Sequence, residues 1–117
     1  MRAAEFQKQS SEATIQAAIC ELLTLKRIPF SVTDSSRVIG PDGRLRRRKV
    51  SAAGWPDITA CLPGGRLLAI EVKSASGRLR ISQRAVLERL QQQGALVVIA
   101  RDVSDVASAI KEEPCHP

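Results

Sequence analysis

The spacing of apolar residues predicts three amphipathic helices. The first covers residues 11–27, and its apolar face repeats every three or four positions: Ile15, Ala18, Ile19, Leu22 and Leu23. Ser11 or the serine before it can cap this helix. Ser82 is expected to cap a second helix that ends at Gly94, and Ser104 to cap a third.

Shorter apolar segments between the helices predict strands. Residues 30–33 alternate between apolar and polar, and residues 57–62 and 66–73 flank a Pro-Gly-Gly turn. The continuous apolar run over residues 95–100 is typical of a strand buried on both faces. Residues 35–53 are predicted to form a loop or an irregular hairpin, because they contain a Gly-Pro-Asp-Gly turn.

The resulting order, α-β-β-β-α-β-α, indicates an α/β protein with a mixed central sheet flanked by helices. The length of 117 residues is that of one domain. We expect its core to span about residues 10–112 and the tail, residues 113–117, to be flexible.

The charge is concentrated in one part of the chain. The net charge is +6, and residues 35–87 carry eleven of the eighteen basic residues but only three acids, Asp42, Asp57 and Glu71. A polyanionic partner is therefore plausible, and the three acids need an explanation.

Several classes of protein are excluded. No apolar run approaches the roughly 20 residues of a membrane helix. Cys20, Cys61 and Cys115 fit neither a disulfide framework nor a zinc motif, so we expect reduced thiols in a cytoplasmic protein. Only three aromatic residues are present, which argues against a single-strand binder built on stacking.

The predicted hairpin brings two of the three acids together. If its turn is centred on Gly64, Asp57 lies opposite Glu71, and a two-residue Gly64-Gly65 turn leaves them near neighbours. Glu71 and Lys73 share a face, because side chains alternate along a strand. Carboxylates about 5 Å apart repel each other unless a cation or a proton lies between them. Carboxylate and carbonyl oxygens are the ligands that Mg²⁺ and Mn²⁺ prefer.

Two polar residues lie on the same helix faces as the apolar residues. Glu12 and Gln83 each stand about one turn before the first apolar residue of that face. Buried polar groups need partners, so we expect both to point at the same site. Each also has an ordinary explanation: Glu12 can favour the helix dipole, Gln83 can be a polar helix start, and Glu71 with Lys73 can be an exposed strand face.

Two motifs resemble those of a nuclease superfamily. Gly54-Trp55-Pro56-Asp57 and Ile70-Glu71-Val72-Lys73, with thirteen residues between the acids, resemble the PD-(D/E)xK motif. Three further segments resemble the VRR-NUC (virus-type replication-repair nuclease) branch: Glu12-x-x-Ile15-Gln16, Ser82-Gln83 and Gly94-Ala95-x-Val97-x-Ile99. The resemblance covers about residues 10–112 and implies a restriction-endonuclease-like core and a stand-alone nuclease of phage or bacterial type.

The resemblance also implies roles for the site residues. A divalent ion, Mg²⁺ or Mn²⁺, would be held by four ligands: Glu12 (directly or through water), Asp57, Glu71 and the backbone carbonyl of Val72. Lys73 would position or deprotonate the attacking water and stabilise charge at phosphorus. Gln83 would orient Lys73 or the water.

Basic residues flank this site in the sequence. They are expected to contact DNA phosphates: Arg37, Arg44, Arg46, Arg47, Arg48, Lys49, Arg78, Arg80 and Arg84. The run over residues 44–49 could alternatively be a solvated loop. The resemblance implies a homodimer on branched DNA, most specifically a Holliday (four-way) junction. A flap, single-strand or nicking nuclease, an RNA substrate and a non-catalytic DNA-binding module remain alternatives. No membrane or small-molecule cofactor is expected.

Overall fold

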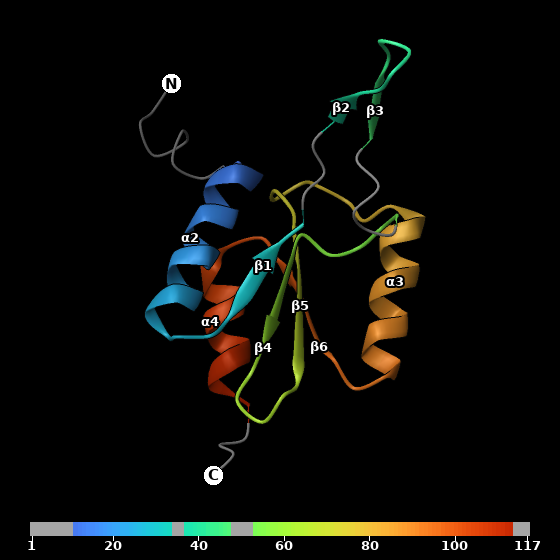
Figure 1. Cartoon of the computed structure of the whole chain (residues 1–117). Coiled ribbons are helices and arrows are strands. Elements are labelled where there is room, and N and C mark those ends of the chain that lie inside the picture. The colour runs from blue at the N-terminus through green and yellow to red at the C-terminus, as the bar shows by residue number, and fades with distance from the viewer. Residues whose placement is uncertain (1–10, 34–36, 48–52, 114–117) are drawn as a thin grey trace.

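Four strands form the central sheet of the protein, in the order β1-β4-β5-β6 (Figure 1). The computed structural model describes residues 11–33, 37–47 and 53–113. The strands are β1 (Phe30–Val32), β4 (Ile58–Cys61), β5 (Leu67–Val72) and β6 (Leu96–Ala100). The first three pair antiparallel and β6 runs parallel to β5, so the sheet is mixed as predicted.

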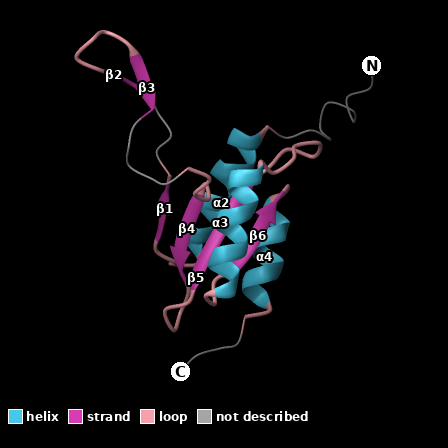
Figure 2. Cartoon of the chain, turned by 90° about the vertical axis from the view of Figure 1, so that its right-hand side faces the viewer, coloured by secondary structure: helices cyan, strands magenta, loops and turns pink. Residues whose placement is uncertain are grey.

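Helices cover both faces of this sheet. α2 (Glu12–Leu25) and α4 (Val103–Lys111) lie together on one face, and α3 (Ile81–Gln92) lies on the other (Figures 1 and 2). α3 is the crossover that joins the parallel strands β5 and β6. The predicted α/β architecture of the PD-(D/E)xK type is confirmed.

β5 is the strand that is buried on both faces. Its even-numbered residues, Leu68, Ile70 and Val72, join the apolar core formed with α2. Its odd-numbered residues Ala69 and Glu71 are also buried and face α3. The sheet therefore separates an apolar core on the α2 side from a polar group on the α3 side.

The prediction that residues 95–100 are buried on both faces is wrong. β6 lies at the edge of the sheet, and Ile99 is 39% exposed. An apolar run thus predicted the strand but not its place in the sheet, since β5 takes the central position instead.

The predicted caps of the last two helices are also wrong. Arg80, not Ser82, stands at the N-cap of α3, where Gln83 Oε1 accepts the Arg80 N–H at 2.9 Å. Asp102, not Ser104, caps α4, and its carboxylate accepts the Ser104 N–H at 2.9 Å. In both helices an acceptor other than the predicted serine binds the free backbone N–H groups. The cap predicted at Ser11 is confirmed.

Residues 37–47, which carry part of the basic charge, form a hairpin that stands apart from the central sheet (Figures 1 and 2). β2 (Arg37–Ile39) and β3 (Leu45–Arg47) pair antiparallel, and we call residues 37–47 the arm. Gly43 has a φ of +79° and its N–H donates to the Gly40 carbonyl at 2.9 Å. This is the three-residue hairpin loop in which a turn is followed by a left-handed glycine.

Three smaller expectations concern the chain ends, the cysteines and membranes. Cys20 and Cys61 are free thiols, whereas Cys115 lies outside the described residues, as do positions 114–117 of the predicted tail. Glu113 is described and forms an ion pair with Arg66. Within the described residues, no helix is long and apolar enough to cross a membrane.

Candidate active site

The register of the β4–β5 hairpin sets the geometry of the site. Ile58 pairs with Ile70, and the Leu62 N–H donates to the Arg66 carbonyl at 2.9 Å, so the turn is centred on Gly64. Asp57 immediately precedes β4 and therefore falls opposite Glu71. This is the first of the two registers that the sequence allowed.

Asp57 is fixed by contacts on both sides of its chain. Its Oδ2 accepts the backbone N–H of Val72 at 2.8 Å, and its backbone carbonyl accepts the Thr33 N–H at 2.8 Å. The Thr33 hydroxyl also donates to the Pro56 carbonyl at 2.5 Å. The N–H and C=O of a residue in an antiparallel strand point to the same neighbour, so the Val72 carbonyl turns toward the Asp57 side.

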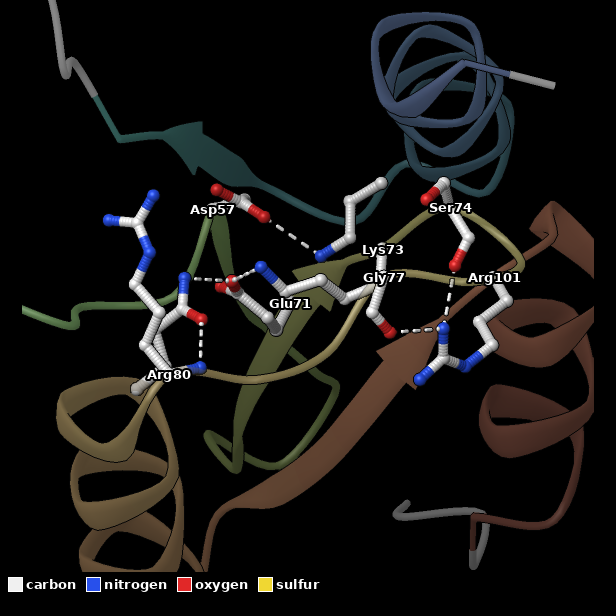
Figure 3. A network of polar contacts seen from close by, with 9 residues as sticks. Asp57, Glu71, Lys73, Ser74, Gly77, Arg80 and Arg101 are labelled. Carbon is white, nitrogen blue, oxygen red and sulfur yellow. Dashed lines mark hydrogen bonds and ion pairs between the residues drawn. The ribbon is translucent and has the colours of Figure 1, made fainter.

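Glu71 is a buried carboxylate with one oxygen bound and one oxygen without a partner. The side chain of Gln83 donates to its Oε2 at 2.6 Å, and Lys73 Nζ lies 3.5 Å from the same atom (Figure 3). Glu71 is 1% exposed, and its buried Oε1 has no hydrogen-bond partner in the described chain. Burial, and then the nearby Asp57 carboxylate, raise the pKa of Glu71 to about 7, and the Lys73 ammonium opposes this shift.

Gln83 is oriented by the start of its own helix. Its Oε1 accepts the Arg80 N–H, which leaves Nε2 as the atom directed at Glu71 (Figure 3). Gly54 determines how close the helix can come, because a Cβ at this position would lie 2.4 Å from the Ser82 carbonyl oxygen. Gly54 also has a φ of +81°, which favours glycine. The motif glycine thus lets α3 approach the site.

Glu12 does not share the buried face, contrary to the prediction. It is exposed, although it begins α2 at the end of the sheet where β4 starts (Figure 1). α2 covers the face of the sheet opposite to Glu71, and within the described chain no hydrogen bond or ion pair joins Glu12 to the other four site residues. Glu12 lies in the first turn of α2, and the buried face of this helix begins only one turn later, at Ile15. The Glu12 side chain therefore remains in solvent.

The donor set that the structure brings together is small but suited to a hard cation. Within the described residues, no group of three or more His, Cys, Asp or Glu side chains could hold a metal ion. Asp57 and Glu71 nonetheless combine two carboxylates with the neighbouring Val72 carbonyl, all oxygen ligands. The partnerless Glu71 Oε1, buried beside a second carboxylate, is where an added cation would relieve both repulsion and desolvation.

The nine predicted DNA-binding residues fall into four groups. Arg44 and Arg46 are exposed on the arm, and Arg78, Arg80 and Arg84 are exposed near the start of α3. The backbones of Arg37 and Arg47 lie in the strands of the arm. Arg48 and Lys49 lie outside the described residues.

Sequence reasoning missed Arg101 as a site-supporting residue. Its Nη1 donates to the carbonyls of Ser74 at 2.6 Å, Gly77 at 2.8 Å and Ala75 at 3.4 Å, which fixes the loop between Lys73 and α3 (Figure 3). Arg101 follows β6 directly, and the parallel strands β5 and β6 have their carboxyl ends at the same end of the sheet. A charged residue directly after the last apolar run was the available signal. Thr33 had no comparable signal.

Comparison with known protein families gives a match that covers most of the chain. The family model described as the VRR-NUC domain matches residues 10–103, which is most of the chain. The chain belongs to the VRR-NUC family. No match was found among curated proteins or among solved structures.

Membership in the VRR-NUC family makes this chain a nuclease domain with DNA as the implied substrate. Nucleases of this kind typically use divalent metal ions. Four residues meet at the end of the sheet where β5 ends: Asp57, Glu71, Lys73 and Gln83. All four fall within the matched region.

Proposed function

We propose that this VRR-NUC chain is a divalent-metal-dependent endonuclease that hydrolyses phosphodiester bonds in structured DNA, most specifically four-way junctions, as a homodimer. The observation that carries the catalytic part is the buried Glu71 carboxylate, which lies beside Asp57 and within 3.5 Å of Lys73 and keeps one oxygen without a partner. A fold alone would not support this proposal, since folds host many functions.

The proposed metal ligands are Asp57, Glu71 and the Val72 carbonyl, with Mg²⁺ or Mn²⁺ as the ion. Asp57 Oδ2 already binds the Val72 N–H, which leaves its other oxygen for a ligand role. Glu12, exposed at the start of α2, is proposed to contribute through water from the same end of the sheet. A bound ion of this kind lowers the pKa of water and neutralises charge on the phosphate.

Lys73 is proposed to act on the reacting groups directly, and Gln83 is proposed to act through Glu71. Lys73 is mostly buried and shares the strand face of Glu71, so its ammonium can hold the attacking water or contact a phosphate oxygen. Gln83 binds both the α3 backbone and Glu71, and therefore positions the carboxylate. Three exposed arginines lie just before α3 or in its first turn, the segment that holds Gln83, and are proposed phosphate contacts: Arg78, Arg80 and Arg84.

The homodimer and the four-way junction are proposed on grounds of symmetry and charge. A two-fold symmetric dimer would present two sites to a substrate with matching symmetry. The concentration of basic residues in positions 35–87 supports binding to phosphates on either side of the site.

The central experiment compares cleavage of four substrates of matched length: a four-way junction, a flap, a nicked duplex and an intact duplex. The full chain is incubated with Mg²⁺, with Mn²⁺ and with chelator at several salt concentrations. We expect metal-dependent cutting with the junction preferred, loss of cutting in Lys73→Ala, and a dimer in sedimentation.

Each other outcome selects an alternative. Equal cutting of junction and intact duplex would exclude the resolvase, and preferred cutting of the flap would make the enzyme a flap nuclease. Binding of DNA without cutting in either metal would leave a non-catalytic module. A monomer that still cuts the junction would remove the dimer from the proposal.

A further inference from the structure

The arm exposes two large apolar side chains side by side. Ile39 is 72% exposed and Leu45 is 64% exposed, and they pair across β2 and β3. Gly40 and Arg44 form the hydrogen-bonded pair next to them, so Ile39 and Leu45 occupy the type of pair in which side chains approach most closely. They form one apolar patch on a hairpin that stands away from the core.

The surroundings of this patch are strongly basic. The arm, residues 37–47, contains four arginines and one acid, Asp42. Asp42 accepts a hydrogen bond from the Arg44 N–H at 3.1 Å and pairs with the Arg46 guanidinium at 2.5 Å, which braces the tip. An apolar partner surface alone would not account for this charge, whereas a polyanion with accessible apolar faces accounts for both features.

The arm is rooted at the proposed active site. The last β1 residue, Val32, pairs with the first β4 residue, Ile58, so the arm leaves the sheet at the rung beside Asp57. Thr33 before the arm is hydrogen-bonded to Pro56 and Asp57 after it. A ligand bound by the arm would therefore be held near the end of the sheet where Asp57 lies (Figure 1).

We propose that the arm is the element that recognises interrupted DNA: the Ile39–Leu45 patch packs against base faces exposed where stacking is broken, while the arginines bind the flanking phosphates. A two-stranded β-ribbon fits a DNA groove, and apolar side chains such as Ile and Leu serve as wedges at unstacked steps. Continuous duplex offers the phosphates but no exposed base face. The arm would thus give selectivity for branch points and nicks, and this inference rests on the proposed nuclease function.

The test measures binding in chelator, so that it does not depend on cleavage. The double variant Ile39→Ser with Leu45→Ser is compared with wild type on a four-way junction and on an intact duplex, each with 2-aminopurine beside the central step. We expect junction affinity to fall about tenfold and duplex affinity to change less than about twofold. The fluorescence change at the junction should be lost with the variant.

Two control variants separate the contributions. Leu25→Ser replaces an apolar residue that is 75% exposed at the end of α2, and it should alter neither affinity. Arg44→Gln should weaken binding to both DNAs and reduce the salt dependence. Circular dichroism of each variant checks that the fold is kept.

Other results would overturn the inference. Equal losses on junction and duplex, or no loss on either, would remove the patch from branch recognition. If the double variant turns a dimeric wild type into a monomer, the patch is instead an interface between two copies of the chain. Because binding is read in chelator, an arm that selects junctions in a chain that never cuts would contradict only the proposed enzyme.

Discussion

Two of the three acids in residues 35–87, Glu71 in the active site and Asp42 on the arm, lie in opposite environments. Glu71 is 1% exposed, and burial beside Asp57 raises its pKa to about 7. Asp42 is exposed, and hydrogen bonds from the Arg44 N–H and then the Arg46 side chain lower its pKa. The fold thus opposes ionisation at the site, where a cation is proposed to bind, and favours it on the arm, where the protein supplies the cation itself.

The supports of the two regions differ as well. The site lies between a central strand and the start of α3 and is fixed by at least four hydrogen bonds or ion pairs. The arm is a two-stranded sheet of its own. Changes at the site should therefore affect chemistry and global stability together, whereas changes on the arm should affect recognition with little effect on global stability.

The largest expected effect is that of Asp57→Asn on cleavage. An asparagine oxygen can still accept the Val72 N–H, so the hairpin should keep its register while a charged ligand is lost. Mutation of residues that only support metal ligands costs about 10–100-fold, so we expect at least about a hundredfold loss of rate. Single-turnover cleavage of the junction measures this.

The comparison variant on the arm is Asp42→Asn, which removes the same charge. It should lower cleavage by no more than about threefold, since it only loosens Arg46. Glu88→Gln, on the exposed side of α3, controls for net charge. Similar losses in Asp57→Asn and Asp42→Asn would show that the site and the arm do not differ in the way described.

An intermediate effect on stability and cleavage is expected at Gly54, and a much smaller effect at Gly43, although the two glycines have similar backbone angles. Gly54 and Gly43 have φ values of +81° and +79°, but only a Cβ at Gly54 would meet another group, the Ser82 carbonyl. Gly54→Ala should cost about 2–4 kcal/mol and lower Tm by about 10 °C, and it should slow cleavage by shifting Gln83.

Gly43→Ala isolates the cost of the backbone angle alone, because nothing lies within 4 Å of its Cβ position. It should lower the global Tm by no more than a degree or two, because the arm is a separate sheet. Calorimetry distinguishes the two variants. A Tm for Gly54→Ala as high as that for Gly43→Ala would mean that α3 can move away without loss.

The sequence was most informative where a period and a turn agreed. The glycine turn limited the β4–β5 hairpin to two registers, both of which kept Asp57 opposite Glu71 or next to it, and strand alternation placed Lys73 on the face of Glu71; the structure has the register centred on Gly64. The position of Gln83, one turn before the apolar face of α3, also predicted that it would point at this site, but not that its partner there would be Glu71 rather than Lys73 or water.

Other features depended on tertiary structure that local patterns do not encode. The position of β6 at the sheet edge is a property of strand order, and apolar content could not predict it. Glu12 was predicted to be buried because the helical period gives the face on which a residue lies, but not how far along the helix the burial of that face continues; in α2 it begins at Ile15. Arg101 and Thr33 bind backbone carbonyls, and such contacts leave no side-chain motif.

The pH dependence of stability without metal compares the two acids most directly. Because the folded-state pKa of Glu71 is raised from 4.5 to about 7, its contribution to stability is fully present below pH 4.5 and is lost as the pH rises through 7. The loss is at most about 3 kcal/mol, and it should be absent in Glu71→Gln. Asp42, whose pKa is lowered, has the opposite sign and loses its contribution only as the pH falls below 3.8. Melting curves from pH 3 to 8 in chelator measure both pH dependences.

Mg²⁺ should raise Tm more at pH 8 than at pH 5, since protons and the ion compete for Glu71. An equal rise at both pH values would show that Glu71 is not a ligand.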